Sequence, residues 1–180
     1  MAKKKVRNIA DPKKNVSLGN PKITQQPNEL SFNLSYKYWM KGVSTKDFSN
    51  KLPSIEDFSK FTHDIFSKLI PTIYEHWKDI ILRRSKSFRH CHLLENKQKE
   101  LALMIAENIH DKTILDEEND FNIWQFGFDG SVRLVAVYDH HNATIYPIFV
   151  DYHHHIYPSI KYNQNDFKNY NFCPHSVYSK

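Results

Sequence analysis

The fold of this chain is indicated by residues 121–158, which read FNIWQFGFDGSVRLVAVYDHHNATIYPIFVDYHHHIYP. Three runs in this stretch have the length and the β-branched or aromatic content of strands: Phe121–Phe128, Ser131–Tyr138 and Ala143–Asp151. An Asp-Gly pair at Asp129 separates the first two runs, and this pair is a strong signal for a two-residue β-hairpin. The pattern predicts an antiparallel β-meander in the last third of the chain.

Upstream of the meander, residues 54–110 carry apolar side chains at helical spacing and predict three helices. Ser54 and Asp57 resemble a capping pair, so the first helix is expected to begin there. Pro71 is expected to end or kink it. Apolar and polar residues alternate over residues 31–39, which predicts a half-buried strand. The fold class is therefore α+β, with an N-terminal strand, three helices and a C-terminal meander.

The first 28 residues have a composition of their own. They contain three prolines and few large apolar side chains, so residues 1–28 are predicted to form an extended, flexible arm. The arm carries seven basic residues against Asp11 alone, a formal charge of +6, whereas the whole chain carries +5. Such an arm suits a phosphate backbone, and the candidate nucleic-acid-binding residues are Lys3, Lys4, Lys5, Arg7, Lys13 and Lys14. The alternative is a solvated tail with no ligand.

The remaining residues, 29–180, are predicted to form a single domain. Its parts are a helical region at 54–110, the meander at 121–158 and a surface tail at 159–180. The chain has only four glycines and no glycine-rich phosphate-binding motif, which argues against a nucleotide-binding fold. Its two cysteines form no disulfide framework, and polar sequence follows the first lysines. No signal peptide and no membrane segment are expected, and the expected location is the cytoplasm.

Eleven histidines occur in 180 residues, and most of them are grouped. Imidazole side chains act as acids, bases or metal ligands. His90, His92 and His153 are the alternative metal-binding set, because a His-x-His pair projects two rings to the same side of an extended segment. The chain lacks the usual paired zinc signatures, so no metal and no other cofactor is expected.

Arg133 is a charged residue inside an otherwise apolar strand, and buried charges need a partner or a ligand. A salt bridge to the acidic segment, residues 111–120, would satisfy it, and so would a bound phosphate. Tyr152, His153 and His154 follow the next strand, and adjacent antiparallel strands place such residues on one face if their registers agree. These side-chain types supply the base, acid and cation that metal-free RNA cleavage requires.

The stretch from Val132 to Tyr157, preceded by two or three helices, resembles the RelE/YoeB class of toxin endoribonucleases. The resemblance covers about residues 95–158. It implies a RelE-like meander in which Arg133 is the cation that stabilises the phosphate. It further implies that His153 or His154, with Tyr152 or Tyr157, are the acid and base. RNA or the ribosome is the implied partner, and an antitoxin or another protein a further one.

The connector FRHCH, residues 88–92, adds a second group of candidates. If it folds over the sheet, Arg89 would join the phosphate site beside His90 and His92. The alternative is that Phe88 and Cys91 belong to the core and the two histidines face water.

The sequence therefore predicts a metal-independent RNA-cleaving toxin, or a related mobile-element or phage-defence protein. One alternative is a non-catalytic protein that binds nucleic acid or the ribosome through the basic arm and exposed aromatic residues. Another is a protein–protein interaction module that uses an aromatic surface.

Overall fold

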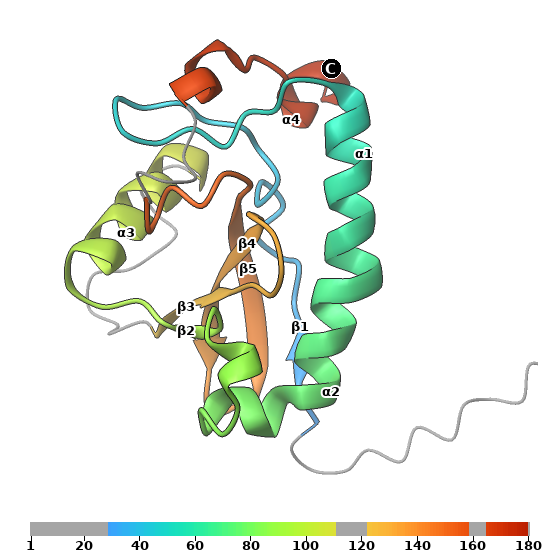
Figure 1. The fold of residues 1–180 in the computed structure, drawn as a ribbon, viewed down its shortest axis with the longest axis vertical. Helices are drawn as coiled ribbons and strands as arrows, with labels where there is room; N and C mark the ends of the chain where they lie inside the picture. The colour runs from blue at the N-terminus through green and yellow to red at the C-terminus, as the bar shows by residue number, and fades with distance from the viewer. Residues whose placement is uncertain (1–28, 111–121, 159–164, 180) are drawn as a thin grey trace, which may run out of the picture.

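The computed structural model of the protein describes residues 29–110, 122–158 and 165–179. The predicted arm, residues 1–28, and the acidic segment, residues 111–120, lie outside the described residues, as does the start of the predicted tail. The described part is an α+β fold in which helices precede a mixed sheet. Figure 1 shows a long helical segment along one side of this sheet and a separate helix on the other side.

Five strands form the sheet in the described part of the chain, namely β1 (Ser31–Phe32), β2 (His92–Leu93), β3 (Ile123–Phe126), β4 (Arg133–Asp139) and β5 (Thr144–Asp151). Their order is β1-β5-β4-β3-β2. Strands β2 to β5 pair antiparallel, while β1 pairs parallel to β5. The predicted antiparallel meander is confirmed, and the two short outer strands extend it into a mixed sheet.

The β3–β4 hairpin is wider than the two-residue turn that the Asp-Gly pair predicts. The last paired residues are Phe126 and Leu134, although Gly130 has the positive φ, 86°, that a tight turn requires. The carbonyl oxygens of Gly130 and Val132 accept hydrogen bonds from Nη1 of Arg133, both at 2.8 Å. The Arg133 side chain therefore provides hydrogen-bond donors for these two carbonyl groups, which have no strand partner in the loop.

The predicted N-terminal strand over residues 31–39 is wrong in its length. Only Ser31–Phe32 pairs, and it adds to the edge of β5. The side chain of Asn33 accepts a hydrogen bond from the backbone N–H of Ser35 at 2.9 Å. Such a local side-chain bond offers the backbone an alternative to a ladder, so the strand ends there.

The first helical segment consists of α1 (Ile55–Asp64), a π-helical turn η2 (Ile65–Leu69) and α2 (Ile70–Ile81), which follow one another directly. The predicted capping pair is confirmed. The hydroxyl of Ser54 accepts the backbone N–H of Asp57 at 3.2 Å and donates to its carboxylate at 2.8 Å.

Pro71 does not end this helical segment, contrary to one expectation. It lies in the first turn of α2, directly after η2. Proline lacks an N–H and crowds the carbonyl one turn earlier, and the wider π turn makes room for that crowding. The hydroxyl of Thr72 donates to the carbonyl of Lys68 at 2.7 Å, which satisfies one carbonyl at the junction. A kink occurs later, at His76, whose φ and ψ are −111° and 17°.

The remaining helical elements are α3 (Asn96–His110), the 3₁₀ turns η3 (Lys86–Phe88) and η4 (Asn165–Asn169), and α4 (Pro174–Tyr178). The segment before α4 is bound to the body of the fold. Leu52 and Phe172 exchange two backbone hydrogen bonds of 3.0 Å, and the N–H of Gly42 donates to Sγ of Cys173 at 3.1 Å. None of the described helices is long and apolar enough to cross a membrane.

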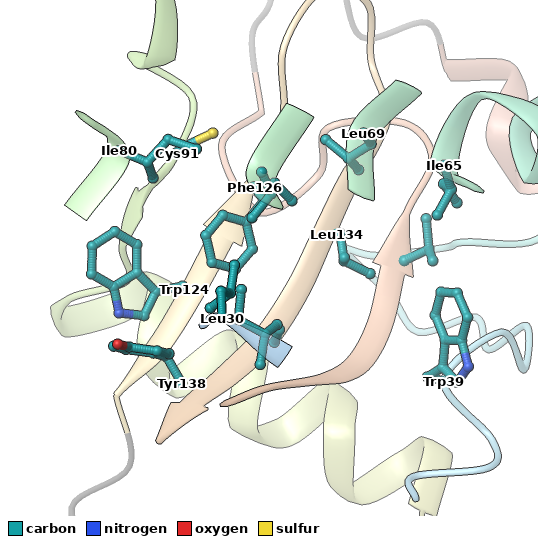
Figure 2. Packing of buried hydrophobic residues seen from close by; sticks show 14 of the residues in the cluster. Leu30, Trp39, Ile65, Leu69, Ile80, Cys91, Trp124, Phe126, Leu134 and Tyr138 are labelled. Atoms are coloured by element: carbon teal, nitrogen blue, oxygen red, sulfur yellow. The ribbon is translucent and has the colours of Figure 1, made fainter. Parts of the chain in front are cut away.

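The two faces of the sheet build two apolar layers, because successive side chains of a strand point to opposite faces. The face toward α1 and α2 carries Trp124, Phe126, Leu134, Ala136 and Tyr138, which pack against Ile65, Leu69, Ile73 and Ile80 (Figure 2). The face toward α3 carries Ile123, Val135, Val137 and Phe149, which pack with Ala102, Ile105 and Ile109. Since both faces are covered, the strands are buried along most of their length.

Truncating Leu134 to alanine should strongly destabilise the fold. Its side chain is fully buried in the middle strand, so the variant leaves a cavity and should lose about 2–5 kcal/mol in free energy of unfolding. Urea unfolding followed by circular dichroism measures this loss. Leu82→Ala is the matched control, because Leu82 is 56% exposed and its truncation should change stability by no more than about 0.5 kcal/mol. Equal effects of the two variants would contradict the assigned core.

Candidate functional site

The α3 face of the sheet carries polar side chains at one end, where three neighbouring strands each contribute one residue. Gln125 comes from β3, Arg133 from β4 and Asp151 from β5, and all three are at most 3% exposed. Arg133 lies directly opposite Asp151 in the antiparallel register. The side chains alternate along each strand, so these three residues share a face with the apolar layer under α3. The sheet therefore continues from an apolar core into a buried polar end.

Arg133 carries the charge at this end. Its Nη1 donates to the carbonyls of Gly130 and Val132, while its buried Nε has no hydrogen-bond partner among the described residues. No carboxylate of the described residues forms an ion pair with Arg133. The ion pair found among those residues joins Lys68 and Asp64, on the first helical segment. An arginine keeps its charge even where burial lowers its pKa, as it does here. The guanidinium is thus a buried cation whose described hydrogen-bond partners are neutral carbonyls.

Gly127 provides the surface on which the Arg133 side chain lies. A Cβ atom at residue 127 would overlap Cδ, Nε and Nη1 of Arg133. Cys91 also contacts Gly127, since its Sγ donates to the Gly127 carbonyl oxygen at 3.3 Å. Burial raises the pKa of the Cys91 thiol to about 11. Cys91 is therefore a packing residue, as one of the two interpretations of the connector expected.

Asp151 holds the loop that follows β5. One carboxylate oxygen accepts the backbone N–H of His153 at 3.1 Å, and the other accepts the N–H of Ile156 at 2.9 Å. These two bonds fold residues 152–157 back over the end of the sheet. The buried acid thus positions the loop that carries the histidine run.

His154 is brought beside Arg133 by this loop. Its backbone adopts the left-handed conformation, with φ of 62°, which is uncommon for a residue with a side chain. Nδ1 lies 2.7 Å from the carbonyl oxygen of Tyr157. A carbonyl only accepts, so Nδ1 carries the proton and Nε2 of the neutral ring has a free lone pair. Burial first, and the positive charge of Arg133 next, lower the pKa of His154.

His90 approaches the same place from the connector. Its ring lies edge-on to that of His154, with 6.2 Å between the ring centres. Nε of Arg89 donates to Nε2 of His90 at 3.1 Å, so this nitrogen is unprotonated. Burial, followed by the charges of Arg133 and Arg89, lowers the pKa of His90. The connector therefore brings the ring of His90 to that of His154, with the side chain of Arg89 bound to His90.

Tyr157 completes the group, which we call the Arg133 cluster and define as Arg89, His90, Arg133, His154 and Tyr157. The ring of Tyr157 lies 5.2 Å from that of His92 and 6.5 Å from that of His154. Burial, with a smaller contribution from Glu95, raises the pKa of its phenol. The cluster combines two guanidinium cations, two imidazoles that are neutral near pH 7 and a phenol that keeps its proton.

Two of the predicted catalytic residues lie elsewhere. Tyr152 follows Asp151 and so points to the opposite face, where it is 1% exposed and packs against Phe61 with ring centres 5.4 Å apart. His153 donates from Nε2 to the carbonyl of Lys51 at 2.8 Å, and its ring lies 5.3 Å from that of Tyr170. The structure therefore brings Arg133 together with His154, whose ring lies 6.5 Å from that of Tyr157, but not with Tyr152 or His153.

The alternative metal set is not assembled in the structure. His92 donates from Nδ1 to the carbonyl of Leu93 at 3.1 Å, and its Nε2 faces the amide nitrogen of Gln125 at 3.5 Å. His153 lies against residues 51 and 170, as described above. Within residues 29–110, 122–158 and 165–179, no three His, Cys, Asp or Glu side chains are grouped so as to hold a metal ion.

Sequence reasoning missed Gly127, Asp151 as the loop's anchor, and Gln125. Gln125 had a visible signal, since it is a polar residue in an apolar strand, as Arg133 is. The basic residues of the arm, Lys3 to Lys14, lie outside the described residues, and so do the acidic residues offered as partners of Arg133.

Acid should destabilise the fold below about pH 6.5, the ordinary pKa of histidine. Burial lowers the pKa of His155, whose ring is 5% exposed and lies 4.2 Å from that of Phe167. The unfolded chain then binds more protons than the folded chain, so stability falls as the pH drops through this range. Urea unfolding at pH 7.5, 6.5 and 5.5 measures it. His155→Gln should flatten the dependence, while His140→Gln, at an exposed turn, should leave it unchanged.

A methyl group at residue 127 should displace Arg133. Gly127→Ala is expected to lower the free energy of unfolding by about 1–3 kcal/mol through overpacking. Arg133→Ala removes the atoms that the methyl group meets, so the loss caused by Gly127→Ala should largely disappear in the double variant. A double-mutant cycle measures this coupling. Additive losses would show that the two residues do not share this contact.

Comparison with known proteins finds a family whose model matches most of the chain. Residues 35–180 match the family described as uncharacterised protein UU032. The chain is 24% identical over 178 residues to uncharacterized protein UU032 of Ureaplasma parvum serovar 3 (strain ATCC 700970), covering 98% of this chain and 97% of that protein. No solved structure matches the chain. The matched region contains all members of the Arg133 cluster and, of the described strands, all but β1. Because the family model covers most of the chain, this protein belongs to the UU032 family.

Proposed function

We propose that this protein cleaves RNA at the Arg133 cluster by metal-independent acid/base catalysis, in the manner of a RelE/YoeB-like toxin or a related defence protein in the cytoplasm. The observation that carries the proposal is the buried guanidinium of Arg133, which has no ion pair among the described residues. The carboxylate of Asp151, opposite Arg133 in the register, favours the charged guanidinium but makes its hydrogen bonds to the loop after β5. A phosphodiester would supply an anion in direct contact with the guanidinium, next to the ring of His154.

The acid and base follow from opposite pKa shifts within the cluster. His154 has a lowered pKa and a free lone pair on Nε2, so it is suited to remove the proton of a ribose 2′-hydroxyl. Tyr157 has a raised pKa and keeps its proton, so it is suited to protonate the leaving 5′-oxygen. Environments that move two pKa values apart assign such roles.

The reaction would form one bond and break another at phosphorus. The 2′-oxygen attacks as its proton passes to Nε2 of His154, and the bond to the 5′-oxygen breaks as Tyr157 donates its proton. The products are a 2′,3′-cyclic phosphate and a 5′-hydroxyl. Solvent then carries the proton from His154 back to the phenolate. Arg133 stabilises the charge that develops on the phosphoryl oxygens, which is the usual role of a fixed cation in such a site.

Arg89 would act as a second cation. Its side chain is exposed, and its Nε donates to Nε2 of His90 at 3.1 Å. His90 thereby positions a guanidinium at the solvent side of the cluster. Both imidazoles are half-buried, so the cluster meets solvent at these rings.

Binding of RNA without cleavage is the second candidate function. It is favoured by the seven basic residues among residues 1–28, which have one acidic residue among them. Binding by such an arm would weaken steeply with salt and would not depend on His154 or Tyr157.

Cleavage of total RNA by the full-length protein in EDTA should depend on the cluster. Arg133→Ala should lower the rate about 10²–10³-fold, as for loss of one charge-stabilising donor. His154→Gln and Tyr157→Phe should each lower it about 10²–10⁴-fold, as for loss of a base or an acid. Product ends analysed by phosphatase and kinase treatment should show the cyclic phosphate.

His153→Gln is the matched control for His154→Gln, because it removes the neighbouring imidazole and keeps a donor for the carbonyl of Lys51. It should cleave at the wild-type rate. Circular dichroism checks that every variant is folded. Equal loss in the two glutamine variants, or an intact RNA substrate with wild-type protein in the presence of ribosomes, would refute the proposed chemistry.

A further inference from the structure

A groove of about 670 Å³ lies on the other face of the sheet from Arg133. One wall is the helical segment α1–η2–α2 between Lys60 and Thr72, and the other is formed by residues 128–132 in the loop of the β3–β4 hairpin. In Figure 1 the helical segment α1–η2–α2 runs along one side of the sheet. Its volume falls within the range of sites that hold a molecule of nucleotide size.

Two half-buried aromatic rings line the groove, one from each wall. Phe61 lies on the helix and Phe128 on the hairpin loop. Each ring is supported by a neighbour, since Phe61 packs against Tyr152 at 5.4 Å and Phe128 against Phe88 at 5.8 Å between ring centres. Held in this way, they offer flat apolar surfaces, which suit a planar ring better than a flexible aliphatic chain.

The charges at the rim have a definite arrangement. On the helical wall, Lys60 is exposed with its ammonium 5.9 Å from the ring centre of Phe61, and Lys68 is exposed and paired with Asp64. On the hairpin wall, Asp129 is exposed. A ligand that complements this rim carries an anionic group at the lysine side and hydrogen-bond donors at the carboxylate side.

A nucleotide unit of RNA has these properties. Its base is planar and can stack on phenylalanine rings, its exocyclic amino group can donate to a carboxylate, and its phosphate is anionic. The hydroxyls of Ser131 and Thr72 already donate to the carbonyls of Tyr152 and Lys68, so they have acceptor capacity left for a base N–H.

The hairpin loop joins this groove to the Arg133 cluster. The carbonyls of Gly130 and Val132, whose residues line the groove, accept the hydrogen bonds of Arg133 from the other face. We propose that the groove is a subsite that binds one base of single-stranded RNA, while the strand passes over the hairpin end to the cluster. This inference rests on the proposed RNA substrate, but it concerns binding alone.

The test uses the full-length protein and a 5′-labelled oligonucleotide of 2′-O-methyl RNA, which lacks the attacking hydroxyl and so cannot be cleaved. Fluorescence anisotropy at fixed low salt measures its Kd. Phe128→Leu keeps apolar volume but removes the stacking surface, and should raise Kd about tenfold. Lys60→Gln should raise it several-fold and make binding less dependent on salt.

Phe66→Leu and Lys78→Gln are the matched controls, because both residues are exposed on the same helical segment and do not line the groove. They should bind like wild type. Circular dichroism checks the fold of each variant. A cross-link from a 5-iodouridine in the oligonucleotide should fall on the peptides that contain Phe61 or Phe128.

The outcomes separate the two proposals. Weaker binding by the groove variants alone supports the subsite, even if the wild-type protein leaves total RNA intact and the ribonuclease proposal fails. Equal Kd values for groove and control variants overturn the subsite, even if cleavage by the Arg133 cluster is observed. Failure of the wild-type protein to bind the oligonucleotide also overturns it.

Discussion

The buried charge of Arg133 constrains the conformation of the β3–β4 hairpin loop and the residues packed around it. Its hydrogen bonds to the carbonyls of Gly130 and Val132 shape the hairpin loop, and Gly127 is needed so that the side chain can lie flat. Burial first, and this charge second, lower the pKa of His90 and of His154. Asp151, opposite Arg133 in the register, bonds to the loop after β5 instead of forming an ion pair. Among the described residues, Asp151 favours the charged guanidinium without forming an ion pair with it, and a buried cation held in this way is suited to binding an anion.

The meander and the helix start were predictable because their signals are local. Apolar runs, an Asp-Gly pair and the Ser54 cap act within a few residues of themselves. The strand over residues 31–39 was misjudged because alternation describes which side chains are apolar and not which backbone groups find partners. Asn33 binds its own neighbour, and β5 offers pairing only at Thr144 and Ile145. Pro71 was misjudged because a π turn, which has no sequence pattern of its own, accommodates it.

The site was predictable in its residue types and only partly in its members. Because Arg133 lies opposite Asp151, strand alternation places the next residue, Tyr152, on the opposite face of the sheet. The register alone therefore excludes Tyr152 from the Arg133 cluster. That register includes a shift between Val135 and Ala136, across from Pro147, and a proline, which has no N–H for the ladder, is typical of such a place. His154 joins the cluster through a left-handed backbone, a conformation that depends on the two bonds made by Asp151. Long-range contacts of this kind cannot be read from spacing.

The two outer strands, β1 and β2, contain only two residues each. A long, flat outer strand presents a row of free N–H and C=O groups that can template the addition of another chain. Here β3, β4 and β5 lie inside the sheet, and β1 pairs with Thr144 and Ile145 of the eight residues of β5. Short outer strands are one of the ways in which a chain rich in tyrosine and phenylalanine, with apolar runs typical of fibril-forming segments, can limit the pairing of its sheet edges with another copy.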